Sequence, residues 1–184
     1  MNKKIEVFSM SIELNIERNQ TLNKEIVTQP EMKLVGISIR TSNAAEFNPE
    51  TAQIGATVQK YISEGVYNQI ANQKNPGTTL CVYTDYESDH SGEFTYFIGA
   101  QVDMDSDAPE GLSTLTIPAQ SYAKFTTDAG VMPSVCINAW MDIWKMTLED
   151  FGSERAFKAD FEVYDGRALD PTNTALDIYI GIKQ

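Results

Sequence analysis

The sequence of 184 residues is poor in the side chains that most often bind metals or act in catalysis. It has one histidine, His90, and two cysteines, Cys81 and Cys136, which are far apart and in no ligand-like spacing. His90 lies in the polar stretch "YESDHSGEF" without a second histidine or a cysteine nearby. A metal site or a histidine-based catalytic triad is therefore not expected. The cysteines are expected to be small buried thiols of a reducing compartment.

Common cofactor and nucleophile motifs are also missing. The sequence has no P-loop, no GxGxxG and no GxSxG motif, so we expect no cofactor and assign no catalytic residue. The run "VDMDSDAPEG" places Asp103, Asp105 and Asp107 at alternate positions, as a calcium loop does. However, Ala108 stands at the position of the sharp-turn glycine, and Thr114 at that of the bidentate glutamate. The run is predicted to be an acidic loop.

Basic side chains are scarce too. The 14 lysines and arginines stand against 26 aspartates and glutamates, which gives a formal net charge of −12. Binding to nucleic acid depends on basic side chains that neutralise phosphates, so no direct nucleic-acid partner is expected. An anionic membrane surface is disfavoured for the same reason. The charge suits a cationic ligand, although a negative surface most often serves solubility.

No apolar run in the sequence is long enough to span a membrane. The first residues, "MNKKIEVFSMSIELNIE", include lysines, but Glu6, Glu13 and Glu17 interrupt the apolar stretch that a signal peptide needs. We therefore expect a cytoplasmic protein.

What the sequence does have is an internal repeat. The stretches "VTQPEMKLVGISIRTSN" (27–43) and "LTIPAQSYAKFTTDAG" (115–130) both contain Thr-x-Pro, a polar step and an alternating apolar segment. The stretches "LCVYTDYESDHSGEFTYFIGAQV" (80–102) and "FEVYDGRALDPTNTALDIYIGIK" (161–183) both have Val-Tyr near the start and Ile-Gly near the end. The first pair is predicted to form strands and the second pair to form hairpins.

A helical segment lies between the strand and the hairpin of each half. Residues 50–71 and 133–151 each carry an apolar stripe at helical spacing. Pro133 is expected in the first turn of the second segment, and Gly152 is expected to end it. The stripes are Ile54, Val58, Ile62, Val66 and Ile70 in the first segment, and Val135, Trp140, Ile143, Trp144 and Leu148 in the second.

Each half is therefore predicted to run β-α-β-β, with three strands, and we expect an α+β fold with two main helices and antiparallel pairing. Residues 23–184 are expected to form this domain, with repeats at 23–105 and 112–184. Residues 1–22 lie outside the repeat and are expected to be an N-terminal extension, either an extra strand or frayed.

The closing hairpin carries the main functional question. Side chains of a strand alternate between its two faces, so Glu162 shares a face with Tyr164, and Asp177 shares one with Tyr179. The other faces are apolar, with Phe161 and Val163 in the first strand and Ile178, Ile180 and Ile182 in the second. The faces that carry a carboxylate and a tyrosine are either exposed to solvent or line a pocket.

These motifs together resemble a known family. "PAQSYAKFTTDAG", the aromatic helix "AWMDIW", "FEVY" and the closing "LDIYIGI" resemble the GyrI-like, AraC-type effector-binding domain. The first half, with "KLVGISIRTSN", is similar to the stand-alone and integron-cassette members of this bacterial family. The resemblance covers residues 24–183, with Gly181-Ile182 where the family usually has proline and an apolar residue. It implies two pseudo-twofold-related repeats in a barrel-like sheet, with a central groove for a lipophilic, often cationic, small molecule.

The resemblance also implies site residues. Glu162 of "FEVY" matches the usual counter-charge, Tyr179 matches the tyrosine of the closing strand, and Trp140 or Trp144 matches the aromatics of the second helix. The resemblance further implies that many members carry a DNA-binding segment before this domain. The residues before the domain in this sequence do not resemble such a segment, so a separate transcription regulator is one expected partner.

The strand pattern adds further candidates for the same ligand site. Tyr164 and Asp177 lie on the faces of Glu162 and Tyr179, and Tyr83 and Tyr96 occupy the matching hairpin of the first half. A buried carboxylate needs a cation or hydrogen-bond donors, and a lipophilic cation also stacks on aromatic rings. Alternatively, Glu162 is solvated and the tyrosines and tryptophans simply pack.

Three functions stay open. The leading hypothesis is a stand-alone binding protein for a lipophilic cation, linked to transcription regulation or to the response to several drugs. The second, implied by hydrolases in the wider family, is hydrolysis of an electrophilic compound with Glu162 as general base. The third is a protein-interaction module that engages a regulator or DNA gyrase.

Overall fold

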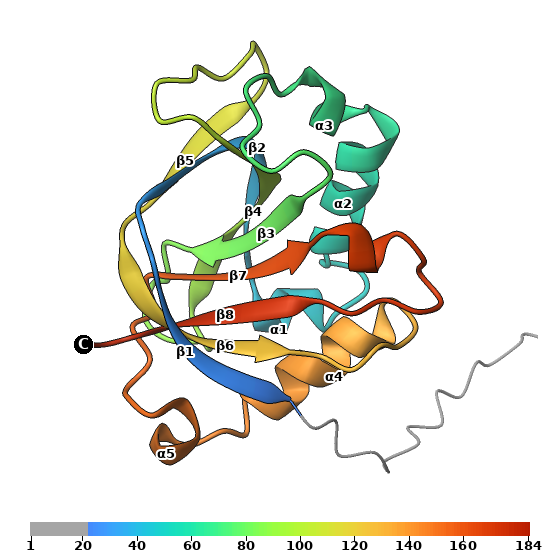
Figure 1. Ribbon diagram of the computed structural model, residues 1–184. Coiled ribbons are helices and arrows are strands. Elements are labelled where there is room, and N and C mark those ends of the chain that lie inside the picture. Colours follow the sequence, from blue (N-terminus) through green and yellow to red (C-terminus); the bar gives the residue numbers. More distant parts are fainter. Residues whose placement is uncertain (1–21) are drawn as a thin grey trace, which may run out of the picture.

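The computed structural model describes residues 22–184, which form one eight-stranded antiparallel sheet with the helices α1–α4 on one side of it (Figure 1). The predicted α+β class, the antiparallel pairing and the two main helices are confirmed, but each half has four strands instead of the three of the predicted β-α-β-β order. Of the predicted extension, residues 1–22, all but the last residue lie outside the described residues. The strands are β1 (Asn23–Gln29), β2 (Met32–Ser42), β3 (Thr79–Thr84), β4 (Glu93–Val102), β5 (Ser113–Ile117), β6 (Gln120–Thr126), β7 (Ala159–Tyr164) and β8 (Asp177–Ile182).

The strand order has a pseudo-twofold symmetry. It runs β1-β6-β8-β7-β3-β4-β2-β5. Exchanging each strand of the first half with its counterpart in the second half gives the same order in reverse. The axis passes between β3 and β7, which pair antiparallel at the centre of the sheet with Cys81 opposite Glu162. The repeat found in the sequence is therefore a repeat of structure.

Each half supplies four strands, because the residues before each Thr-x-Pro proline form a strand of their own. β1 ends at Gln29, just before Pro30, and pairs with β6 of the other half. β5 ends at Ile117, just before Pro118, and pairs with β2. Proline has no backbone N–H to donate to a neighbouring strand, so a strand ends readily there. The first strand of each half is thus exchanged onto the other half, which ties the two together.

The main helices are α2 (Ile54–Ser63) and α4 (Ser134–Ile143), and the short ones are α1 (Asn43–Glu46), α3 (Val66–Gln69) and α5 (Leu148–Phe151). The first predicted segment breaks at Gly65, which adopts a left-handed conformation at φ 60°. The second predicted segment is divided into α4 and α5. Pro133 is the N-cap residue of α4 instead of lying in its first turn, whereas Gly152 ends α5 at φ 80°, as predicted. Within residues 22–184, no helix combines the length and apolarity that crossing a membrane requires.

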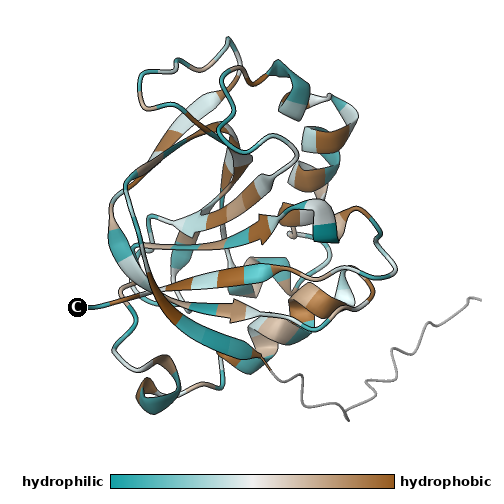
Figure 2. Ribbon diagram, in the orientation of Figure 1, coloured by the Kyte–Doolittle hydropathy of each residue, from teal (hydrophilic) through white to brown (hydrophobic). Residues whose placement is uncertain are grey.

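Hydrophobic residues recur along the strands and the main helices (Figure 2). Their side chains pack on both faces of the sheet. One cluster lies under α2 and contains Tyr61 and Ile98, and a second lies under α4 and contains Ile143 and Ile180. A third cluster fills the opposite face and includes Phe161. Each main helix is therefore anchored on its own patch of the sheet, on either side of the central β3–β7 pair.

Two positions in the first half require glycine, because the backbones of β2 and β4 approach each other closely there. Gly36 of β2 lies opposite Gly99 of β4, and a Cβ on either would run into a backbone carbonyl of the partner strand. We expect Gly99→Ala to lower the free energy of unfolding by about 1–3 kcal/mol, since backbone must shift to make room. Urea denaturation measures this. Gly55→Ala is the control, because a Cβ there meets nothing within 4 Å; equal costs for both would contradict the steric explanation.

Candidate ligand-binding site

A cavity of about 750 Å³ lies on the helical side of the sheet. This volume is within the range of small-molecule sites. Residues of β3, β4 and β7 line it from the sheet, and residues of α2 and α4 line it from the two halves. Its aromatic lining consists of Phe47, Tyr61, Tyr83, Tyr86, Phe94, Tyr96, Trp140, Trp144 and Tyr164.

Glu162 of β7 is the buried acid of this lining, with 2% of its surface exposed. The hydroxyl of Tyr83 donates to Oε1 at 2.7 Å, and the indole Nε1–H of Trp140 donates to the same atom at 2.6 Å. The hydroxyl of Tyr164 donates to Oε2 at 2.7 Å, and the thiol of Cys136 lies 3.4 Å from Oε1. Hydrogen bonds to a carboxylate are strong, and here they replace the water that burial removes.

The pseudo-twofold axis explains why these groups meet. "LCVY" of β3 and "FEVY" of β7 are equivalent, so Tyr83 and Tyr164 are equivalent tyrosines and Cys81 is the counterpart of Glu162. Cys81 lies opposite Glu162 in the β3–β7 register. Tyr83 is then a diagonal neighbour of Glu162, and diagonal neighbours in a sheet are within reach of long side chains. The axis therefore places one tyrosine on each oxygen of a single carboxylate.

Burial keeps the donors protonated. Burial raises the pKa of the Tyr83 and Tyr164 hydroxyls well above the usual range, and the negative charge of Glu162 raises both further. The same two causes, in the same order, raise the pKa of the Cys81 and Cys136 thiols. The hydroxyls therefore remain donors, and the thiols lack the thiolate character of a nucleophilic cysteine.

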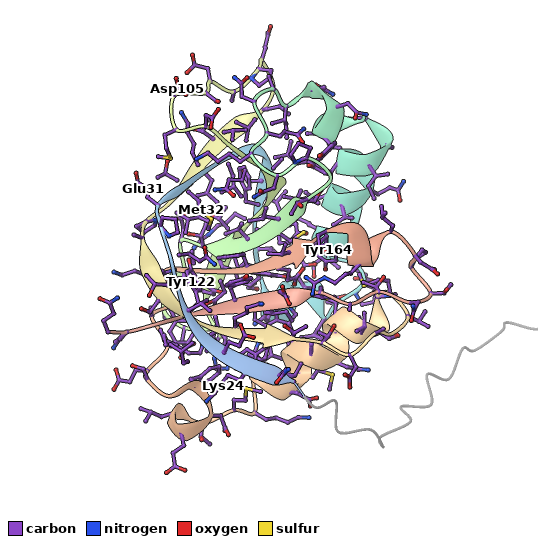
Figure 3. All side chains as sticks on the ribbon, in the orientation of Figure 1. Lys24, Glu31, Met32, Asp105, Tyr122 and Tyr164 are labelled. Atoms are coloured by element: carbon purple, nitrogen blue, oxygen red, sulfur yellow. The ribbon has the colours of Figure 1, made fainter. Side chains whose placement is uncertain are left out.

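Six of the eight site residues predicted from the sequence line the cavity. They are Glu162, Tyr164, Trp140, Trp144, Tyr83 and Tyr96. Tyr164 lies at the end of β7 beside the helices, whereas Tyr122 lies away from them (Figure 3). Tyr122 belongs to the cluster on the other face of the sheet.

Tyr179 and Asp177 are not brought to the cavity. The ring of Tyr179 stacks on Phe161, with centroids 4.4 Å apart and planes 12° apart, beside the cluster on the opposite face. Asp177 pairs with Arg167 at 2.9 Å and with Lys124 at 3.5 Å. The reason is register: residues directly opposite across a ladder share a face, and Glu162 lies opposite Ile178. The face of β8 that adjoins Glu162 is therefore its isoleucine face.

Sequence reasoning missed several cavity residues. Cys81 lines the cavity, and its spacing of two from Tyr83 could have placed it on the same face. The predicted stripe residues Ile54, Val58 and Ile62 line the cavity. Ile54 and Val58 also pack against the cluster under α2, whereas Ile62 is exposed. Phe47, beyond the end of α1, also lines the cavity and had no signal in the sequence.

A second buried acid lies near Glu162 on the same face of β7. Asp160 is fully buried and accepts hydrogen bonds from Arg155 at 2.6 Å, from the Tyr86 hydroxyl at 2.7 Å and from the Gly181 N–H at 2.7 Å. Arg155 also lies over the ring of Phe157, 4.3 Å from its centroid. Because Asp160 is paired with a cation, Glu162 is the buried acid of this face without a basic partner.

Across residues 22–184, no group of three or more histidine, cysteine, aspartate or glutamate side chains is arranged to hold a metal ion. His90 lies among the cavity-lining residues without a second ligand of this kind.

Comparison with known proteins agrees with this architecture. A family model described as integron-associated effector binding protein (Cass2) matches residues 25–182. YobU of Bacillus subtilis, provisionally named as a transcriptional regulator, is 28% identical over 152 residues, covering 83% of this chain and 92% of YobU. An integron cassette protein from the mobile metagenome of Vibrio cholerae shares 27% identity with a TM-score of 0.67, over 90% of this chain and all of that one.

A second solved structure, SAV2435 bound to tetraphenylphosphonium, superposes with a TM-score of 0.68. It covers 88% of this chain and 94% of SAV2435 at 20% sequence identity, so the likeness shows a shared fold.

Proposed function

The chain belongs to the integron-associated effector binding protein family, and we propose that its effector is a lipophilic cation held in the cavity with Glu162 as counter-charge. The observation that carries this proposal is the buried Glu162 carboxylate, held by Tyr83, Trp140 and Tyr164 in an aromatic cavity and without a basic partner. A cation with apolar substituents would supply the opposite charge and stack on the rings around it.

The hydrogen bonds to Glu162 favour one class of cation. A carboxylate has about four lone-pair positions. Three of them accept from Tyr83, Trp140 and Tyr164, and the Cys136 thiol is a fourth, weaker donor 3.4 Å from Oε1. A primary ammonium group brings three N–H donors and would leave most of them without partners in an apolar cavity. A quaternary ammonium or phosphonium ion has no such donors. We therefore infer that the effector carries a charge without N–H groups, and the binding of tetraphenylphosphonium by SAV2435 supports this choice.

The same contacts do not favour the hydrolase hypothesis. A general base needs an oxygen that can accept a proton from water beside the substrate. Both oxygens of Glu162 already accept hydrogen bonds from Tyr83, Trp140 and Tyr164, and the neighbouring thiols are not activated. Binding is therefore preferred to catalysis. A link to transcription regulation or drug response, and a separate regulator or gyrase as partner, stay predictions.

Tryptophan fluorescence tests the proposal directly, because the only two tryptophans, Trp140 and Trp144, both line the cavity. Phenethyltrimethylammonium, phenethylammonium and the neutral analogue with carbon in place of the quaternary nitrogen form a matched set. We expect saturable quenching by the quaternary cation, with an affinity about tenfold or more above that of the primary ammonium. The neutral analogue is the control for apolar binding alone. Equal binding of the neutral analogue and the cation would contradict a counter-charge role for Glu162.

A further inference from the structure

The mouth of the cavity is surrounded by exposed apolar side chains. Phe47 is 70% exposed, Ile62 67% and Ile137 51%, and all three belong to the cavity lining. They are three of the eight large apolar side chains exposed in residues 22–184, so the opening of the cavity is partly apolar. Single exposed apolar residues need no explanation, but a group around a cavity is typical of a binding surface.

Phe47 is exposed on a backbone that is held in place. The preceding residue, Glu46, accepts hydrogen bonds from the Thr41 hydroxyl at 2.6 Å and from the N–H groups of Gln53 and Ile54, each at 3.1 Å. The Ser42 hydroxyl caps α1 by accepting from the Ala45 N–H at 3.2 Å. These contacts fix the corner between α1 and α2. The ring of Phe47 is therefore presented at a defined position, which lowers the entropic cost of binding to it.

A line of aromatic rings joins this mouth to the carboxylate. The ring of Phe47 meets Trp144 edge-on at 6.0 Å between centroids, Trp144 is 6.3 Å from Trp140, and Trp140 is 4.9 Å from Tyr83. Trp140 and Tyr83 are the two donors to Oε1 of Glu162. The line begins in the first half at Phe47 and continues on α4 of the second half, so it crosses the cavity mouth.

We propose that Phe47 and Trp144, whose rings are in contact at the edge of the cavity, form an outer subsite that binds a second apolar group of the same ligand. This inference rests on the proposed function and adds the class of ligand: an elongated cation with its charge at one end and an aromatic group at the other. The charged end lies at Glu162 and the aromatic end lies against Phe47, with the connecting chain along the tryptophans. A compact cation fills only the inner part of the cavity and leaves the outer subsite in water.

The test compares alkyltrimethylammonium ions with and without a terminal phenyl group, in a series of increasing chain length, on the wild type and on Phe47→Ala. Calorimetry is the readout, because Phe47 touches Trp144 and its loss would alter the fluorescence. In the wild type we expect the phenyl group to raise affinity by about three- to tenfold once the chain is long enough to reach the mouth. In Phe47→Ala this gain should disappear, so that ions of equal chain length bind alike with and without the phenyl group.

Leu169→Ala is the matched control, because Leu169 is 83% exposed and lies outside the cavity lining; it should keep the phenyl gain. A phenyl gain that is absent in the wild type, or that survives in Phe47→Ala, would overturn the outer subsite while leaving the proposed function intact. Failure of every cation to bind would remove the proposed function and the outer subsite together.

Discussion

Glu162→Gln is expected to weaken binding of a quaternary ammonium or phosphonium ion by at least about tenfold, or roughly 1.4 kcal/mol. The variant keeps the size and shape of the side chain and removes only the charge that would face the cation. In an apolar cavity this charge is screened far less than at the surface, so its loss has a large effect. Titrations of wild type and variant with the same cation, followed by tryptophan fluorescence and calorimetry, measure the difference.

Glu162→Gln is also expected to fold. The amide oxygen can accept from Tyr83 and Trp140, as Oε1 does now, and the Tyr164 hydroxyl can turn to accept from the amide N–H₂. Asp177→Asn is the control for net charge, because it removes a carboxylate from the same hairpin but outside the cavity. We expect it to leave cation affinity within about twofold. Equal affinities of the wild type and Glu162→Gln would mean that the carboxylate serves packing and not binding.

The contrast between Glu162 and Asp177 shows what strand alternation predicts and what it does not. Alternation correctly placed Glu162 with Tyr164, and Asp177 with Tyr179, because the two residues of each pair are on one strand. It does not say which faces of two paired strands coincide, since this depends on register. The register places Glu162 opposite Ile178 and Phe161 opposite Tyr179.

The repeat contained the missing information. Aligning Ile98-Gly99 with Ile180-Gly181 makes Tyr179 the counterpart of Phe97, not of Tyr96. Phe97 lies in the cluster on the face away from the helices, which is where Tyr179 packs. The place of the Phe47 ring could not be predicted in this way, because its contact with Trp144 joins segments that are distant in sequence. The domain boundaries, the cytoplasmic location and a partner beyond the ligand stay predictions.

The symmetry also shows how a repeated fold comes to carry a single charge. The position of Glu162 is occupied in the first half by Cys81, directly across the central strand pair. Two carboxylates at these positions would face each other in a buried site and repel. With cysteine on one side, the two equivalent tyrosines, Tyr83 and Tyr164, both donate to the one carboxylate. The scaffold supplies matched donors, and the difference between the halves leaves a single buried carboxylate.

Asp160→Asn is expected to cause the largest loss of stability, about 3–5 kcal/mol, because it breaks a buried ion pair and leaves Arg155 without its counter-charge. The Asp160 side chain is fully buried and that of Arg155 is only 10% exposed. For a chain of this size the loss corresponds to a fall in Tm of roughly 6–20 °C. Urea and thermal denaturation of the wild type and the variant measure it.

An exposed ion pair provides the control. Lys183 and Glu154 lie 2.7 Å apart, but both side chains are about 60% exposed. Glu154→Gln should lower the free energy of unfolding far less than Asp160→Asn, since water and salt screen such pairs. The double variant Arg155→Met/Asp160→Leu should lose less stability than Asp160→Asn, because it leaves no unpaired buried charge. If Asp160→Asn instead lowers the free energy of unfolding no more than Glu154→Gln does, the ion pair does not stabilise β7. The position of Glu162, two residues further along the same strand, would then depend on the hydrogen bonds to its own carboxylate.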